Sequence, residues 1–289
     1  MELTRGVYNM LHQMIQNFKS AFIFSPGHSS TLILLAITFG IVLGGIWLAL
    51  FWPPMFKKPW LWVVIIVSAI FTWTARAFVQ TPLMIWSQEV GNNLWDPAKL
   101  NYIDLILLVG IPQMLFIGIV EEGAKLVPVL FYWWGSKRSL TPKFGLMLGA
   151  VSGAGFGIFE AINKINMNNV YRWNWSSTGV GQSGILSSVS SIIFHTISTA
   201  LLGYGLTKRK AWLYFMIVVL AHGFGDYVSI ILQPNNRLTT IQVDLLDGIL
   251  LLAITIVVLW LRWHKTKEIT AFNPQSVVPD INQQPPATP

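Results

Sequence analysis

This 289-residue sequence is poor in cysteine and in charged residues. It contains no cysteine, which excludes disulfide bonds. Only 11% of its residues are charged, whereas a soluble domain carries about 25%. That shortage excludes an ordinary soluble protein. Together with a hydrophobic content of 53%, it indicates an integral membrane protein.

A continuous basic surface and a cleavable signal peptide are also missing. The net charge is +7, but the basic residues lie in separate groups between apolar segments. Such groups are typical of topology signals, so we expect no nucleic-acid partner. The N-terminus lacks a basic region followed by a compact apolar core and a small-residue cleavage site, so we expect no cleaved signal peptide.

Seven apolar segments are long enough to cross a bilayer as helices of about 20 residues. They predict an all-α polytopic bundle of about seven transmembrane helices, near residues 31–52, 59–80, 103–134, 143–163, 183–206, 212–232 and 243–263. The third segment contains Pro112 and Pro128, so it predicts either two helical pieces or one kinked helix.

The regions on either side of this transmembrane domain, residues 31–263, differ from it in character. Residues 1–30 mix polar and apolar positions at helical spacing, which predicts an amphipathic helix at the membrane interface. Residues 264–289 are rich in Pro, Gln and Asn, so we expect them to be disordered. We interpret the segments 81–102 and 164–182 as outer loops that sense or gate.

Lysine and arginine predict the orientation, because cytoplasmic loops carry an excess of them. The short loops on one side hold Lys57, Lys58, Lys137, Arg138, Lys143, Lys208, Arg209, Lys210, Arg262, Lys265 and Lys267. The loops on the other side are longer and hold fewer basic residues. We therefore expect the N-terminus outside and the C-terminus inside.

Ionisable side chains occur inside the predicted spans in four short patterns. These are Glu121-Glu122-Gly123-Ala124-Lys125, Phe156-x-x-x-Glu160, His195-x-x-x-Thr199 and His222-x-x-x-Asp226. A charge at the bilayer centre costs about 2.5–3.5 kcal/mol on insertion scales, so such residues usually serve a function. Carboxylates and imidazoles activate water or bind metals, so the patterns predict chemistry within the membrane.

Helical spacing indicates how these groups pair. Residues four apart share a helix face, so Glu121 is expected near Lys125, whereas Glu122 projects about 100° away. That arrangement leaves Glu122 to face a site, although spacing alone allows the reverse assignment. His222 and Asp226 also share a face, so we expect Asp226 to orient the imidazole.

The charge balance of the four patterns requires a cation or bound protons. Their four carboxylates are opposed by one lysine, which leaves three negative charges uncompensated in a low dielectric. Two imidazoles and a carboxylate form a known zinc ligand set, so we predict Zn²⁺ on Glu160, His195 and His222. Glu121 or Glu122 would then be the general base. Proton uptake without a metal satisfies the balance equally, and the His-Glu-x-x-His zinc motif is absent.

Other polar or small residues in the spans are interpreted as structural. Glycines at four-residue spacing form a ridge that lets a neighbouring helix approach closely: Gly145, Gly149, Gly153 and Gly157. Four charged residues lie near predicted span ends, where long side chains reach the interface at low cost: Arg76, Asp104, Asp244 and Asp247.

The four motifs, in this order, resemble those of the PrsW family of intramembrane proteases, distant relatives of the CAAX-processing and bacteriocin-immunity membrane proteases. The resemblance extends from Glu121 to Asp226. It implies a prokaryotic protease of the cytoplasmic membrane, and some family members make the first (site-1) cut in a membrane-anchored anti-sigma factor on its extracytoplasmic side. The positions that match the family motifs are Glu121, Glu122, Glu160, His195, His222 and Asp226.

We therefore expect an intramembrane peptidase that cuts a membrane-anchored protein near the outer face. Its substrate would enter through a cleft lined by small residues of the fourth and sixth spans. A proton-coupled transporter would instead use the Glu, His and Asp groups as a relay, but it predicts internal repeats that the sequence lacks. A non-enzymatic sensor or immunity protein would keep the scaffold without activity, and the intact carboxylates and histidines argue against that loss.

Overall fold

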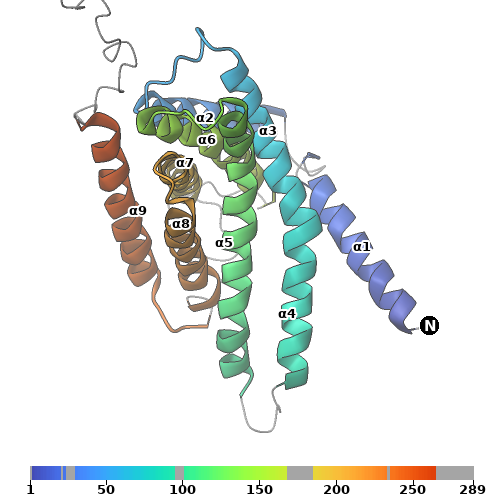
Figure 1. Ribbon diagram of the computed structural model, residues 1–289. Coiled ribbons are helices and arrows are strands. Elements are labelled where there is room, and N and C mark those ends of the chain that lie inside the picture. Colours follow the sequence, from blue (N-terminus) through green and yellow to red (C-terminus); the bar gives the residue numbers. More distant parts are fainter. Residues whose placement is uncertain are drawn as a thin grey trace, which may run out of the picture.

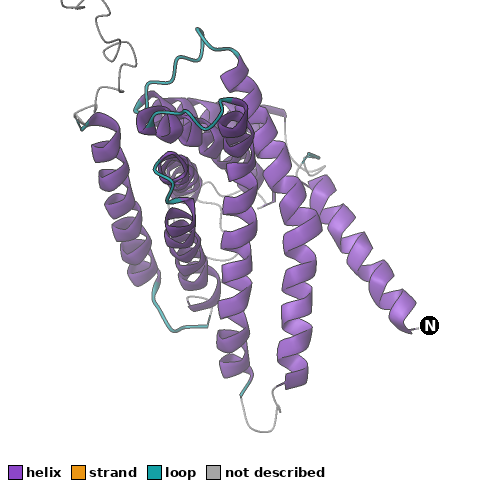
Figure 2. Cartoon of the chain, viewed as in Figure 1, coloured by secondary structure: helices purple, strands orange, loops and turns teal. Residues whose placement is uncertain are grey.

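The structure is a computed structural model that describes residues 2–20, 22–23, 30–94, 101–167, 185–232 and 235–264. These residues form helices joined by turns, and none of them is in a strand (Figure 2). The predicted all-α class is confirmed. The helices are α1 (Glu2–Ser20), α2 (Ser30–Ala49), α3 (Trp60–Ala75), α4 (Thr81–Leu94), α5 (Tyr102–Gly135), α6 (Pro142–Met167), α7 (Ile185–Thr207), α8 (Ala211–Asp226) and α9 (Thr240–Trp263), with π-helices η1 (Arg76–Gln80) and η3 (Tyr227–Leu232).

Six helical segments are long and apolar enough to cross a membrane, and they make up most of the bundle in Figure 1. They confirm six of the seven predicted spans. The remaining one, 31–52, corresponds to α2, whose apolar part Ile33–Ala49 is shorter. The third span is a single helix, because α5 runs unbroken through Pro112 and Pro128.

The second span is longer than predicted and runs from Trp60 to Leu94 through α3, η1 and α4. The interpretation of 81–102 as a loop is therefore wrong for its first 14 residues, which form α4. Pro82 has no N–H to continue an ordinary α-helical ladder. The π-helix accommodates this break, since the Thr81 N–H donates to the carbonyl of Arg76, five residues earlier.

Helices α6 and α7 form the densely packed centre of the bundle. In their most apolar stretches 78% of the residues are buried, against 12% in α9, which stands at one side of the bundle (Figure 1). The glycine ridge of α6 faces α7. A Cβ atom on Gly149 would collide with the carbonyl oxygen of Thr199, and one on Gly153 with that of His195. The predicted close approach is confirmed, and it fixes the position of the His195 backbone.

Helix α1 packs its C-terminal end against the second span. The Asn17 side-chain amide donates to Thr81 Oγ1 at 3.1 Å, and the Asn17 carbonyl accepts from Trp73 Nε1 at 3.2 Å. The predicted helix in this region is confirmed, while its place at the membrane interface stays a prediction. The predictions for residues 168–182 and 265–289 fall outside the described part of the chain.

Candidate active site

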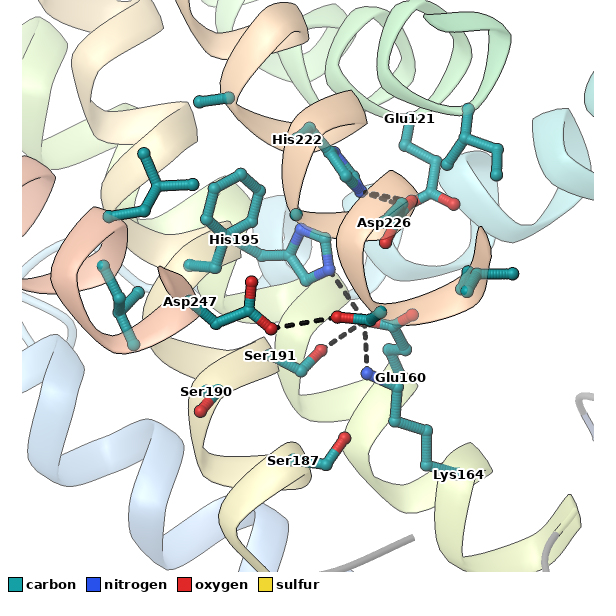
Figure 3. A pocket seen from close by; sticks show the side chains of 18 of the residues that line it. Glu121, Glu160, Lys164, Ser187, Ser190, Ser191, His195, His222, Asp226 and Asp247 are labelled. Atoms are coloured by element: carbon teal, nitrogen blue, oxygen red, sulfur yellow. Dashed lines mark hydrogen bonds and ion pairs between the residues drawn. The ribbon is translucent and has the colours of Figure 1, made fainter. Parts of the chain in front are cut away.

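A cavity of about 360 Å³ lies among α5, α6, α7, α8, α9 and the two π-helices. Figure 3 shows most of the ionisable residues that line it, which are Arg76, Glu121, Glu160, Lys164, His195, His222, Asp226 and Asp247. Five of the six predicted site residues are among them, and the sixth, Glu122, lies behind the cavity wall. Ala221 and Gly225 of α8 line the cavity as expected of small residues, whereas the glycine ridge of α6 packs against α7 instead.

Close contact between α5 and α8 brings the glutamate pair to His222. A Cβ atom on Gly118 of α5 would come within 2.7 Å of the Val219 carbonyl oxygen of α8, so only glycine allows this spacing. One turn further along α5, Glu121 and Glu122 then face α8 and its histidine. Small residues therefore set both helix contacts, α5–α8 and α6–α7, on which the site depends.

Glu121 faces the cavity and keeps one carboxylate oxygen without a hydrogen bond. Its Oε1 lies 3.3 Å from Nε of Arg76, and its Oε2 lies 3.7 Å from Nε2 of His222. Oε2 is buried and has no hydrogen-bond partner among the described residues. A buried carboxylate oxygen without a partner is costly, so this atom is the one best placed to receive a water, a proton or a metal ion.

Glu122 points away from the cavity, and both of its carboxylate oxygens have partners. Its Oε1 accepts from Lys125 Nζ at 2.6 Å and lies 2.7 Å from Nδ1 of His222. Its Oε2 accepts from the Ser198 hydroxyl at 3.2 Å. Lys125 thus pairs with Glu122, three residues away, and not with Glu121 as the simplest spacing argument predicted. The reverse assignment, which spacing also allowed, is the one observed.

His195 connects this buried group to the cavity. Its Nδ1 lies 2.6 Å from Lys125 Nζ, and its Nε2 lies 2.7 Å from Glu160 Oε2. An ammonium group only donates, so Nδ1 accepts and the neutral ring carries its proton on Nε2, which donates to Glu160. This tautomer is inferred from the contacts. Phe156, one turn before Glu160, packs edge-on against the ring at a centroid distance of 4.8 Å.

His222 is oriented from the opposite side. Since its Nδ1 contacts Glu122, its Nε2 is turned towards Glu121 and towards Asp226, whose Oδ2 is 3.5 Å away (Figure 3). The expected pairing with Asp226 is present, but the shorter contact with Glu122 fixes the ring. The two imidazole centroids are 5.3 Å apart, and Phe194 packs against both rings.

Glu160 is held by several groups at once. Its Oε1 accepts from Arg76 Nη1 at 3.1 Å, and its Oε2 accepts from the Ser191 hydroxyl as well as from His195. Lys164 lies 3.8 Å from Oε2. These partners come from η1, α6 and α7, so Glu160 joins three elements at one wall of the cavity.

One group of three side chains is placed to hold a metal ion. Glu121, His195 and His222 each offer a ligand atom, and these atoms lie within 4.8 Å of one another. The donor set of two nitrogens and one oxygen suits zinc, and the unengaged Glu121 Oε2 agrees with it. Binding through His195 Nε2 requires this nitrogen to give up its proton and its hydrogen bond to Glu160, so the ring proton would lie on Nδ1 with a neutral Lys125 as its acceptor. The residues therefore fit a metal, and Glu160 as a ligand stays a prediction.

The interpretation of Arg76 as a span-end feature is wrong, because it lies inside the span Trp60–Leu94 and contacts Glu121 and Glu160. Asp247 lines the cavity and accepts from Ser229 at 2.9 Å, and its structural interpretation stays a prediction. The sequence feature that could have identified Arg76 as a site residue is its position within an apolar run, where a charged side chain usually has a function. Asp104 agrees with its structural interpretation, because it forms an exposed ion pair with Arg237. The side chain of Asp244 lies outside the described part of the structure.

Three charged residues outside the motifs, Arg76, Lys164 and Asp247, change the charge balance of the site. Five carboxylates belong to the cavity and the network behind it: Glu121, Glu122, Glu160, Asp226 and Asp247. Three cations oppose them: Arg76, Lys125 and Lys164. The difference is two negative charges, one fewer than the sequence motifs gave. It equals the charge of one divalent cation or of two protons.

Residues 57–260 match the model of a protein family described as PrsW family intramembrane metalloprotease. The matched region begins just before α3, ends within α9 and contains all four motifs. No curated protein sequence and no solved structure matches the chain.

Proposed function

Since the chain belongs to the PrsW family of intramembrane metalloproteases, we propose that it hydrolyses a peptide bond of a membrane-anchored protein inside the cavity. The observation that carries this proposal is the unengaged Oε2 of Glu121 beside two histidines. A carboxylate in this position takes the proton of an attacking water, and the surrounding dipoles stabilise the developing oxyanion.

The other residues of the site have separate roles in this proposal. Glu122 holds His222 by Nδ1, so that Nε2 faces the reacting atoms together with Asp226. In the site without a metal, His195 presents its Nε2–H from the neighbouring helix, held in that tautomer by Lys125. Both imidazoles are therefore oriented by groups behind them, as in sites where a carboxylate fixes a histidine.

Two ligand sets are compatible with a bound metal, for which zinc is our proposal. His195 and His222 belong to both, with Glu121 as the third ligand from the geometry or Glu160 from the motif pattern. When bound, zinc would polarise the scissile carbonyl and make a water more acidic. In either set, the glutamate that is not a ligand remains beside the site as the base. If no metal binds, Glu121 is the base and the histidines supply the hydrogen bonds.

The substrate class follows from the family and from the setting of the cavity. We propose a membrane-anchored protein, such as an anti-sigma factor, cut near the extracytoplasmic face in a site-1 reaction. With α2 counted as a seventh crossing, the distribution of lysine and arginine supports an N-terminus outside and a C-terminus inside the cytoplasmic membrane. The lipid bilayer is then the medium through which the substrate reaches the cavity.

A reconstituted assay tests the proposal directly. The purified chain is placed in proteoliposomes with a library of single-span reporter peptides whose residues on the extracytoplasmic side are randomised. Mass spectrometry of the fragments identifies cut bonds. The wild type is expected to cut a subset of reporters, and the Glu121→Gln/Glu122→Gln double variant to cut none. Equal cleavage by the double variant would sink the proposed mechanism.

The metal is tested separately by elemental analysis of protein prepared without chelators. About one zinc per chain in the wild type, lost in the His195→Ala/His222→Ala variant, would support the two-histidine site. No metal in either protein, with cleavage retained by the wild type, would assign the reaction to the glutamates and histidines alone.

A further inference from the structure

The geometry points to Arg76 as a positioning residue of this site, one whose guanidinium sets the spacing between Glu121 and Glu160. No motif of the sequence includes this arginine. The inference rests on the proposed function, since the two glutamates are the carboxylates between which that function divides the roles of ligand and base. Arg76 is not assigned a contact with substrate.

The first observation is the pair of ionic contacts. Nε of Arg76 lies 3.3 Å from Oε1 of Glu121, and Nη1 lies 3.1 Å from Oε1 of Glu160. The two glutamates stand on different helices, α5 and α6, and both line the cavity. A planar guanidinium with donors in a fixed fork determines the distance between two acceptors, which a lysine ammonium does not.

The second observation is that Arg76 itself is firmly placed. It opens the π-helix η1, and its carbonyl accepts the Thr81 N–H at the break that Pro82 requires. The guanidinium packs over the Trp73 ring at 4.6 Å, a cation–π contact. Trp73 is in turn held by the Asn17 carbonyl of α1 through its indole N–H. The arginine is therefore fixed from its backbone and from one face of its guanidinium.

The third observation concerns the surroundings of Arg76. It lies in the middle of the 35-residue apolar helical segment Trp60–Leu94, and its side chain is only 28% exposed. A charge within such a segment is costly and is found where it has a partner or a function. Without Arg76, the Oε1 atoms of Glu121 and Glu160 would both lose their cationic partner inside the cavity wall. Repulsion would then move the two carboxylates apart or neutralise one of them.

Catalytic geometry is sensitive to such a movement, because a displacement of about 1 Å in a reacting group can cost about 10²-fold in rate. Loss of the Arg76 guanidinium should therefore lower kcat by about this factor and leave KM little changed, since Arg76 does not touch the substrate. Arg76→Lys should give an intermediate kcat, because a point charge neutralises the carboxylates without holding them apart.

The test uses the reporter that the wild type cuts best, in proteoliposomes, with Arg76→Ala and Arg76→Lys. Arg262→Ala is the matched control, because this arginine donates to the Phe51 carbonyl at 2.9 Å and does not line the cavity. Added guanidinium chloride at millimolar concentration should restore kcat in Arg76→Ala and leave Arg76→Lys and Arg262→Ala unchanged. If Arg76→Ala lost activity only because its fold was disturbed, added guanidinium would not restore its kcat.

A wild-type kcat in Arg76→Ala would overturn the inference, as would a fall that guanidinium does not reverse. If Arg76→Ala does not fold, it is studied with Glu121→Gln and Glu160→Gln, where no carboxylate remains to be separated. The thermal midpoint should then be largely restored, and a midpoint that stays low would contradict the positioning role of Arg76. Absence of cleavage by the wild type would overturn the proposed function instead, while this stability coupling still decides whether Arg76 positions the two glutamates.

Discussion

The two sides of the histidine pair are built in opposite ways. Behind the rings, Glu122, Lys125 and Ser198 are completely buried, and each carboxylate oxygen of Glu122 has a partner within 3.2 Å. In front of them, Glu121 keeps a buried oxygen without a partner and Asp226 is partly exposed to the cavity. A satisfied polar network stabilises a fold, whereas an unsatisfied group is available for chemistry.

Adjacent glutamates serve these two sides because of helix geometry. Consecutive residues on a helix point about 100° apart, so one α5 turn sends Glu122 into the packed interior and Glu121 into the cavity. We name the buried group Glu122, Lys125 and Ser198 the rear network. The comparison predicts that changes in the rear network reduce stability and that changes at the cavity reduce activity with the fold intact.

The largest effect is expected from Glu121→Gln. A glutamine keeps the shape of the side chain but cannot take a proton, so cleavage should fall by about 10²–10⁴-fold. The thermal midpoint should fall less than in Glu122→Gln, since Oε2 makes no hydrogen bond and Arg76, which faces Oε1, keeps Glu160 as a partner. Initial rates in proteoliposomes and melting in detergent measure both quantities.

Glu122→Gln is the matched variant of the same pair. It removes the anionic partner of Lys125 and so should lower the thermal midpoint. If Glu121→Gln melted early and Glu122→Gln did not, the division between the two sides would be wrong.

The next effect is on stability, from Lys125→Met. Removing the buried lysine leaves the Glu122 carboxylate without its cation, which typically costs about 3–5 kcal/mol. Glu122→Gln added to Lys125→Met removes the unpaired charge and should recover much of that loss. Chemical denaturation of the single and double variants in detergent gives the comparison. Equal instability of the two would show that the lysine acts through packing and not through its charge.

Much of the fold, and the convergence of the motifs, followed from the sequence. Long apolar runs fix the spans by length, and the glycine ridge of α6 indicated the close contact on which His195 depends. The motifs on α5 to α8 meet because consecutive spans pack side by side. What spacing could not decide was which glutamate faces the cavity, since that depends on the rotation of α5 against α7 and α8.

Arg76 and α4 were missed for a related reason. The run after residue 80 contains polar residues and a proline, a pattern typical of a loop, and only the π-helix η1 lets the helix continue. Because the sequence predicts that the second span ends at residue 80, Arg76 was interpreted as an arginine whose long side chain reaches the membrane interface at low cost. Its contacts with Glu121 and Glu160 join residues 45 and 84 positions apart, which no local pattern reveals.

A smaller effect is expected from the spacing between α6 and α7. Gly153→Ala would place a methyl group against the His195 carbonyl, and such overpacking typically costs about 1–3 kcal/mol. The backbone shift should also lower cleavage, because His195 contacts both sides of the comparison. Gly45→Ala is the control, since nothing lies within 4 Å of its added Cβ atom. If both variants lost the same stability, the loss would not come from the contact between α6 and α7.

The finest test compares two serines of α7 that each donate to a glutamate. Ser198 donates to Glu122 in the rear network, and Ser191 donates to Glu160 at the cavity wall. Ser198→Ala should cost about 1.5–3 kcal/mol of stability, the range for a hydrogen bond to a charged group. Ser191→Ala should change stability less, because Glu160 keeps Arg76 and His195 as partners. Its main effect should be on cleavage, about fivefold for 1 kcal/mol. Cleavage rates and melting midpoints are measured on both variants. A stability loss in Ser191→Ala with a cleavage loss in Ser198→Ala would contradict the division between the rear network and the cavity.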